Sequence, residues 1–205
     1  CYQERGHCPG GESIQTSLLH CFFLPSWEQA RVLEVAQQAV TQGIARPILV
    51  GRARVITNRI AELGLRVRPG IDVDLLDPAD NPSFEGHCAA FYASVKRLGY
   101  TPQEARETVR RDATVLAATL LRTGEADAMI CGTVGRYLRH LRHVEEIIGK
   151  APGVHRLTSM NAIVLHAGTL FIADTYVQED PNAEDLAEIA RLCAQQVRRF
   201  GIEPK

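Results

Sequence analysis

The sequence predicts an α/β protein, a parallel-sheet sandwich with helices on both faces of the sheet. Three observations support this prediction. Between residues 27 and 150, segments with helical periodicity alternate with short apolar runs, which is the pattern of parallel strands joined by helices. One of these runs, within residues 124–149, leads through a glycine turn into a helix. Hydrophobic residues form 45% of the 205 residues, which is enough for a buried core.

The expected elements follow one another closely. Helical periodicity predicts helices at residues 32–43, 54–63, 84–98, 101–109, 112–121, 136–148 and 180–200. Apolar runs predict strands at residues 48–51, 73–76, 126–131 and 169–173 and within 156–166, and residues 18–24 are a candidate first strand. A hairpin turn is expected at Ala167 and Gly168. Because Thr101 is followed by Pro102 and, three residues on, by Glu104, it is expected to cap a helix.

The stretch from Gly124 to Gly149 is where a binding site is expected. Its strand, expected to be central in the sheet, ends at Cys131, and Gly132 and Gly135 then bracket a tight turn before the helix. Ligands of open α/β sheets bind at such a place, because amide groups of the strand end and of the helix N-terminus face the same crevice.

Arg136, Arg139 and Arg142 recur at every third position of the following helix and share one stripe. Arginine binds phosphate bidentately, so the stripe is a candidate anion site. A solvated helix face remains the alternative. The buried face of this helix is expected to hold Leu138, Leu141, Val144, Ile147 and Ile148, and that of the last helix Leu186, Ile189, Leu192, Cys193, Val197 and Phe200.

Arg111 and Asp112 stand at a junction between two expected helices. Such a pair usually forms a local salt bridge or a helix cap. An arginine buried at the break would instead reach a ligand, and both interpretations stay open at this point.

Composition and charge argue against several classes of protein. The net charge of -1 lacks the basic excess of a nucleic-acid-binding protein. No apolar run approaches the roughly 20 residues that span a bilayer, so no membrane segment is expected. The six cysteines contain no C-x-x-C pair, which argues against a disulfide framework and favours a cytoplasmic location.

The first 26 residues differ in style from the rest of the chain. They hold five potential zinc ligands, at Cys1, His7, Cys8, His20 and Cys21. Adjacent His-Cys pairs do not match the spacings that bring four ligands to one zinc ion, so no metal is expected. The segment is therefore interpreted as divergent or disordered.

Several longer motifs resemble the phosphate acetyl/butyryltransferase family. They are Arg111-Asp112 at a helix start, GEADAMICG at 124–132, IIG at 147–149, PGV at 152–154 and FIADT at 171–175. The sequence is most similar to one branch, the C-terminal phosphotransacetylase-like domain of bacterial multimodular NADP-dependent malic enzymes. ARPILVGR at 45–52 and GTVGRYLRHLRHV at 132–144 also have counterparts there. The resemblance covers residues 27–205.

The resemblance implies a two-subdomain phosphotransacetylase-like fold, truncated at the C-terminus. Residues 27–150 would form the first subdomain and residues 151–205 the incomplete start of the second. The cleft would bind acyl-CoA or acyl phosphate, and Arg111 and Arg142 match two arginines of the family that hold phosphate. Gly132, Thr133, Arg136 and Arg139 are the further binding candidates. The family's catalytic Ser/Arg/Asp group would follow Lys205, so no catalytic residue is expected here.

The resemblance leaves three functional interpretations. The first is an acetyl-CoA-responsive regulatory and oligomerisation module of an NADP-dependent malic enzyme, which converts malate to pyruvate and CO2. NADP and a divalent metal would then belong to an absent malic domain, and the full-length protein would self-associate. The second is a phosphate acetyltransferase, which moves acetyl between acetyl phosphate and CoA. The third is a non-catalytic α/β binding module.

The turn sequence distinguishes the first two interpretations. Active transferases carry small hydroxyl residues and a histidine there, whereas this chain has Gly135, Arg136 and Tyr137, as the malic-enzyme branch does. This departure favours the regulatory module. A truncated domain would also leave apolar surface uncovered, so marginal stability is expected of the isolated chain.

Overall fold

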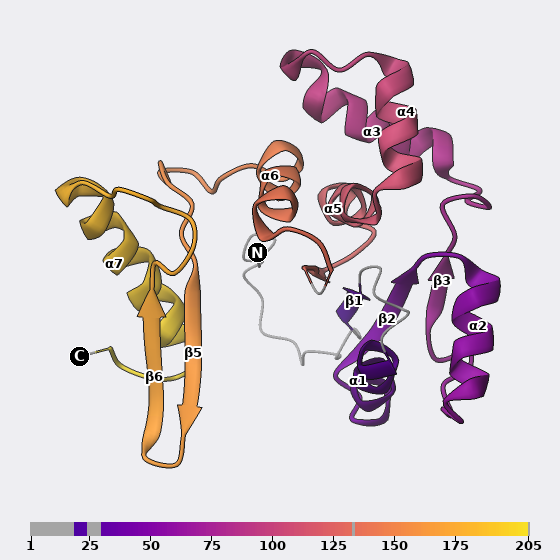
Figure 1. The fold of residues 1–205 in the computed structure, drawn as a ribbon, viewed down its shortest axis with the longest axis horizontal. Helices are drawn as coiled ribbons and strands as arrows, with labels where there is room; N and C mark the ends of the chain where they lie inside the picture. The colour runs from indigo at the N-terminus through magenta and orange to yellow at the C-terminus, as the bar shows by residue number, and fades with distance from the viewer. Residues whose placement is uncertain (1–18, 24–29, 133, 205) are drawn as a thin grey trace, which may run out of the picture. The chain divides into compact units, whose positions relative to one another are not determined.

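The computed structural model describes residues 19–23, 30–132 and 134–204 (Figure 1). The chain forms two compact units, one ending at Gly149 and the other beginning at Lys150. That these two units correspond to the two expected subdomains stays a prediction. The cysteines and histidine at positions 1, 7 and 8 lie outside the described residues, and so does Thr133.

The first unit is built on a four-stranded sheet in the order β3-β2-β1-β4. The strands are β1 (Leu19–Phe23), β2 (Ala45–Val50), β3 (Asp74–Leu76) and β4 (Ala128–Ile130). All three pairings are parallel, which confirms the predicted parallel sheet. The candidate first strand is present as β1, between β2 and β4. The strand that ends near Cys131 was expected to be central, but β4 lies at the edge of the described sheet.

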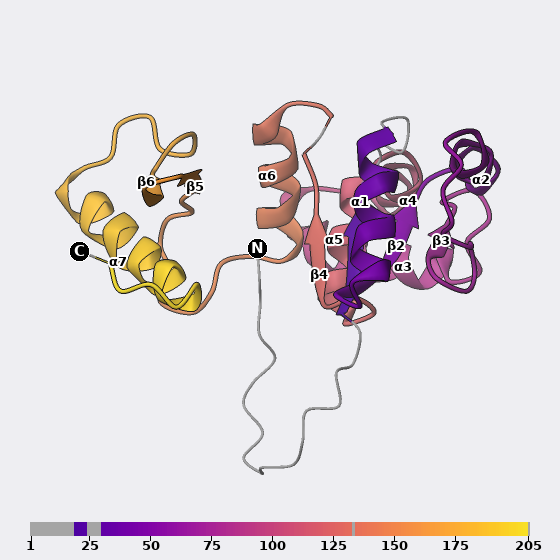
Figure 2. The same ribbon diagram turned by 90° about the horizontal axis from the view of Figure 1, so that it is seen from below.

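Helices cover both faces of this sheet (Figures 1 and 2). On one face Leu49 of β2 packs with α1 (Ala30–Thr41) and α2 (Ala53–Glu62). On the other, Ile48 and Val50 pack with a larger group of helices. This group consists of α3 (Phe84–Val95) with the short η1 (Lys96–Leu98), α4 (Pro102–Arg111), α5 (Ala113–Thr123) and α6 (Tyr137–Ile147). The alternation along β2 follows from the two-residue period of a strand.

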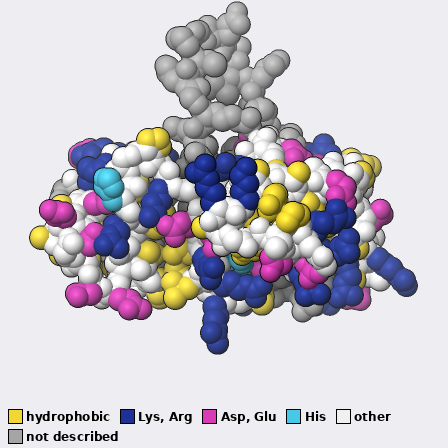
Figure 3. Space-filling model, turned by 90° about the horizontal axis from the view of Figure 1, so that it is seen from above, with side chains coloured by type: hydrophobic (Ala, Val, Ile, Leu, Met, Phe, Trp, Pro, Cys, Tyr) yellow, Lys and Arg dark blue, Asp and Glu magenta, His cyan; other side chains and the backbone are white. Residues whose placement is uncertain are grey.

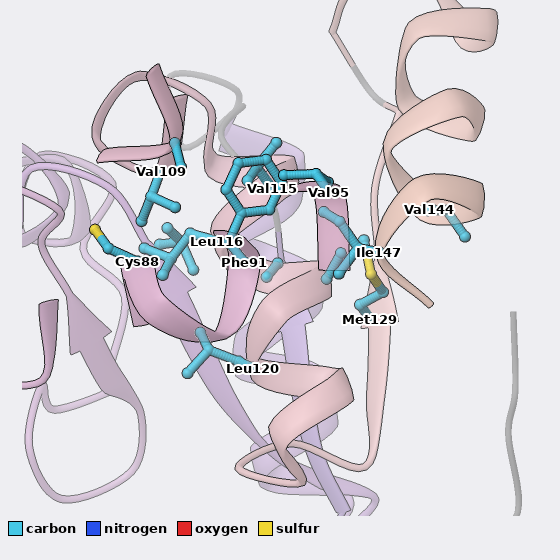
Figure 4. Packing of buried hydrophobic residues seen from close by; sticks show 14 of the residues in the cluster. Cys88, Phe91, Val95, Val109, Val115, Leu116, Leu120, Met129, Val144 and Ile147 are labelled. Atoms are coloured by element: carbon cyan, nitrogen blue, oxygen red, sulfur yellow. The ribbon is translucent and has the colours of Figure 1, made fainter. Parts of the chain in front are cut away.

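Helix α5 is the buried centre of the larger group. Every residue from Thr114 to Leu120 is buried. Around it Phe91 and Val95 of α3 and Val109 of α4 form the core (Figure 4). A helix that is apolar on all sides must be enclosed by its neighbours, so α5 serves as the fixed element of the unit.

The starts of α4 and α5 are both capped, and the cap of α4 is the one that the sequence predicts. The amide of Glu104 donates to Oγ1 of Thr101 at 3.2 Å, and the amide of Thr101 donates to the Glu104 carboxylate at 2.8 Å. The amide of Thr114 donates to Oδ1 of Asp112 at 2.9 Å, so Asp112 is the N-cap of α5. Local capping at the Arg111–Asp112 junction is therefore confirmed.

Helix α6 is fastened to α5 at both ends. Oγ1 of Thr114, at the start of α5, lies 2.9 Å from Nδ1 of His140. At the other end, Arg122 donates to the carbonyl of Ile147 at 2.7 Å. Because α5 is enclosed by the core, these contacts give α6 a defined position.

The second unit contains an antiparallel hairpin of β5 (Met160–Leu165) and β6 (Gly168–Ala173) and the helix α7 (Ala183–Arg199). The predicted hairpin is confirmed, with its turn at His166 and Ala167 rather than at Ala167 and Gly168. Asp174 organises the segment after β6. Its carboxylate accepts a hydrogen bond from Oγ of Ser159 at 2.6 Å and from the amide of Gln178 at 2.8 Å. The pKa of Asp174 is lowered because these bonds outweigh the effect of its burial.

Three positions expected to be buried are exposed in the structure. Leu138 is 61% exposed, Leu186 54% and Phe200 65%. The apolar face of each helix is wider than the area that the other described residues cover. Only part of each face is therefore buried. On α6 the buried members are Val144 and Ile147.

The surface carries both signs of charge. Figure 3 shows lysine and arginine side chains next to aspartate and glutamate side chains on one face. No helix in the described part of the chain has the length and apolarity needed to cross a bilayer. Cys88, Cys131 and Cys193 are free thiols.

We predict that Phe91→Ala lowers the free energy of unfolding by about 3–5 kcal/mol, because the ring is fully buried and its removal leaves a cavity. Urea denaturation followed by circular dichroism measures the change. Val35→Ala is the control, since Val35 is 48% exposed and its truncation should cost under about 0.5 kcal/mol. A loss below about 1 kcal/mol for Phe91→Ala would show that the core is packed differently.

Candidate functional site

A depression of about 620 Å³ on the first unit is lined by residues of both α4 and α6. Its wall combines basic, acidic and aromatic side chains. The lining residues are Tyr100, Glu104, Glu107, Thr108, Arg111, Asp112, Leu138, Arg139, Arg142 and His143. All of them come from the end of the η1–α4 loop, from α4, from the junction before α5 and from α6.

Three of the predicted binding residues line this depression together. Arg111 is the last residue of α4, whereas Arg139 and Arg142 lie on α6. The packing of α6 against α5, whose start directly follows Arg111 and Asp112, brings these arginines into one site. Arg111 is exposed rather than buried at the helix break. A surface with three guanidinium groups suits an anion that has several oxygen acceptors.

The other predicted binding residues are not part of the lining. Arg136 is the N-cap of α6 and is exposed, and Gly132 follows β4 with no atom within 4 Å of the position that a Cβ would take. Thr133 lies outside the described residues. Their roles in binding stay predictions.

Two of the three arginines are paired with carboxylates. Nη2 of Arg139 donates to Oδ2 of Asp112 at 2.7 Å, and Nε of Arg142 donates to Oε1 of Glu146 at 2.7 Å. The side chains of Arg139 and Arg142 remain 66% and 72% exposed. A guanidinium has five N–H donors, so one such bond leaves others for a ligand.

The Asp112 carboxyl stays ionised in this setting. Burial alone would raise its pKa, but His143, the Thr114 amide and Arg139 all favour the charged form and hold the pKa well below its ordinary value. The pKa of Tyr100 is raised by burial and by the charge of Glu146, so its phenol is neutral near pH 7. The ring of Tyr100 also contacts Phe91 edge-on, with centroids 5.7 Å apart, which connects the site to the core.

The glycine turn before α6 is held by His140. Nε2 of His140 lies 2.7 Å from the carbonyl oxygen of Val134, which only accepts hydrogen bonds. Nε2 is therefore the donor, and in the neutral ring Nδ1 accepts from the hydroxyl of Thr114. Gly135 has φ +104°, and a Cβ there would lie 2.8 Å from Nε2 of His140. The turn thus requires glycine for conformation and for space.

Tyr100, Thr108 and Glu146 take part in the site but were not singled out from the sequence. The pair of Arg142 and Glu146 has the i,i+4 spacing of a helical ion pair, so spacing alone was a usable signal. Tyr100 and Thr108 gave no such signal. Among the side chains that the structure describes, within residues 30–132 and 134–204, no three of His, Cys, Asp or Glu are grouped as metal ligands would be.

Comparison with known proteins points to one family. A family model described as "Phosphate acetyl/butaryl transferase" matches residues 19–205. The chain is 46% identical over 182 residues to an NADP-dependent malic enzyme of Escherichia coli, a match that covers 89% of this chain and 24% of that protein. It is 33% identical over 184 residues to a phosphate acetyltransferase of Synechocystis, which covers 89% of this chain and 26% of that protein.

A solved structure supports the same assignment of fold. A phosphotransacetylase from Streptococcus pyogenes matches with a TM-score of 0.82 at 25% identity, over 91% of this chain and 56% of that one. The predicted phosphotransacetylase-like fold is thereby confirmed. The chain spans about a quarter of the length of the curated relatives described above.

We predict that Gly135→Ala destabilises the protein by about 1–3 kcal/mol, because the added methyl group must displace His140 from Val134. Gly132→Ala is a matched control, since Gly132 has a similar φ of +99° but open space around it. Urea denaturation of both variants separates backbone strain from the steric contact. Equal losses in the two variants would show that the contact with His140 is unimportant.

We also predict that the stabilisation from Asp112 depends on pH. Its pKa is lower in the folded state than in the unfolded chain, so the carboxylate contributes stability above about pH 4, and this contribution is lost as the pH falls further. Asp112→Asn keeps a good helix cap and removes the charge. The variant should be less stable by about 1–3 kcal/mol at pH 7, and the difference should shrink at pH 3.

Urea denaturation at both pH values measures this difference. The control is Asp80→Asn, a change at an exposed loop residue. If the difference in the free energy of unfolding between wild type and Asp112→Asn stays constant from pH 7 to pH 3, the lowered pKa of Asp112 is contradicted.

Proposed function

The chain belongs to the phosphate acetyl/butyryltransferase family, and from this premise we propose that its depression binds the phosphate-bearing part of an acyl-CoA or acyl phosphate. The observation that carries the proposal is the convergence of Arg111, Arg139 and Arg142 on one surface. Oxygens of a phosphate group accept charge-assisted hydrogen bonds from guanidinium groups, and binding to exposed arginines costs little desolvation.

We further propose that the module regulates a malic enzyme rather than transferring acetyl groups itself. The identity of 46% to a malic enzyme exceeds the 33% to a phosphate acetyltransferase. The turn supports the same choice. The family resemblance implies hydroxyl side chains and a histidine there in active transferases, whereas this chain has Gly135, where a side chain would meet His140.

The rest of the parent protein's activity is proposed from similarity alone. Conversion of malate to pyruvate and CO2, with NADP and a divalent metal, would belong to residues outside this chain. In that protein the module would respond to acetyl-CoA and contribute to self-association. We also keep a cytoplasmic location as part of the proposal.

Phosphate acetyltransferase activity is the second candidate. The observation that favours it is the relatedness to enzymes named phosphate acetyltransferase, at 31% and 33% identity. The two candidates share the binding step and differ in turnover, so one set of experiments separates them.

We predict that calorimetric titration of the 205-residue chain with acetyl-CoA and with acetyl phosphate detects binding without formation of the transfer product. Arg142→Ala should weaken binding by about tenfold or more, because it removes charge-assisted hydrogen bonds to the ligand. Arg59→Ala is the matched control, since Arg59 also forms an intrahelical ion pair, with Glu62, but lies on α2.

Three outcomes are distinguishable. Binding that is lost in Arg142→Ala and kept in Arg59→Ala supports the regulatory module. Turnover of acetyl phosphate and CoA would show that the chain is a phosphate acetyltransferase instead of a regulatory module. If neither ligand binds, the proposed function is wrong, and a non-catalytic binding module is the interpretation that remains.

A further inference from the structure

The imidazole of His143 lies close to the two carboxylates that pair with Arg139 and Arg142. Its Nε2 lies 3.4 Å from Oδ2 of Asp112, the same oxygen that accepts from Arg139. Its Nδ1 lies 3.7 Å from Oε2 of Glu146, whose other oxygen accepts from Arg142. The imidazole thus stands between the two carboxylates that hold two arginines of the depression.

The arrangement is incompletely satisfied while the imidazole is neutral. A neutral imidazole has one N–H donor and one acceptor, so it can donate to only one of two carboxylates. Nδ1 of His143 and Oε2 of Glu146 are buried, and among the described residues neither atom has a hydrogen-bond partner. The side chains themselves are only 12% and 11% exposed. A buried acceptor without a donor is costly, and a second proton on the ring would supply that donor.

The side chains around the imidazole include more acidic than basic groups. The lining and Glu146 together present four carboxylates against three guanidinium groups. The titratable and charged groups that line the depression with His143 or contact it are Arg139, Arg142 and Glu146 on α6; Glu104, Glu107, Arg111 and Asp112 on α4 and its end; and Tyr100 in the preceding loop. Arg122 of α5 bonds the far end of α6, and His140 of α6 is engaged by Thr114 and Val134.

We infer that His143 is a positioning residue: when protonated, it can donate a hydrogen bond to each carboxylate and neutralises one of their two charges, so that both guanidinium groups are held less strongly and are available to an incoming anion. In the neutral state the two arginines balance Asp112 and Glu146 and are partly occupied by them. An anion that draws the arginines outward leaves these carboxylates to His143, which then takes up one proton from solvent. Anion binding and proton binding therefore support each other, as linkage requires.

This inference rests on the proposed function, because it assumes that the depression binds an anion. It adds a dependence of anion affinity on pH, which three arginines alone would not produce. Arginine keeps its charge at all ordinary pH values, so a site of arginines by itself would bind a fixed anion equally from about pH 5.5 to 8. Histidine changes charge in that range. The module would hold its phosphate-bearing ligand more tightly as the surroundings become more acidic.

The test uses inorganic sulfate, whose charge is constant over this range, unlike that of phosphate. Calorimetric titration of the 205-residue chain at low ionic strength should give about tenfold tighter binding near pH 5.5 than near pH 8. Repeating the titration in buffers of different ionisation enthalpy should show uptake of a proton on binding. A nuclear magnetic resonance titration of the His143 ring in the wild-type protein should show that sulfate favours its protonated form.

Two variants complete the test. His143→Gln keeps a hydrogen-bond donor but cannot titrate, so its sulfate affinity should be the same at both pH values. His166→Gln replaces an exposed histidine of the β5–β6 turn and should keep the tenfold change. Thermal unfolding checks that both variants are folded, and the resonance titration of the wild type needs no variant.

The results that overturn the inference differ from those that overturn the proposed function. Sulfate binding that is independent of pH in the wild type, or a tenfold change that persists in His143→Gln, refutes the role of His143 and leaves the anion site intact. Absence of sulfate binding at either pH refutes the anion site and, with it, both proposals.

Discussion

Asp112 is the residue through which the buried core and the charged surface of the first unit are joined. Its Oδ1 caps the buried helix α5, and its Oδ2 accepts from Arg139 on α6. One carboxylate thus caps the start of a helix, pairs with a guanidinium group and contacts His143. The backbone amide and the two basic side chains outweigh the effect of burial and keep the carboxylate ionised.

Rigidity of the site comes from α5 rather than from the residues that line it. Most side chains of α5 are buried, and Thr114 and Arg122 hold the two ends of α6. Arg139 and Arg142 are exposed, and each is held by one ion pair, which contributes little stability at a surface. A fixed backbone with movable guanidinium groups is suited to binding an anion without rearrangement of the fold.

The proposed function and the inferred role of His143 concern the same set of charges. Family membership suggests the kind of ligand, and the depression offers three guanidinium groups to it. Asp112 and Glu146, which pair with Arg139 and Arg142, set how available the guanidinium groups are to the ligand. In this proposal the arginines pair with the carboxylates when the His143 imidazole is neutral and with the ligand when it is protonated. Protonation of His143 would therefore be part of the binding equilibrium.

The sequence alone determined the α/β class, most of the elements and the Thr101 cap, because periodicity and capping depend on residues close together in the chain. It also pointed to Arg111, Arg139 and Arg142. Only the tertiary structure decided that these three share one surface while Arg136 does not, and that Leu138 is exposed. The physical reason is that the fastening of α6 to α5 sets which side of α6 faces α4, and this contact joins residues 26 positions apart.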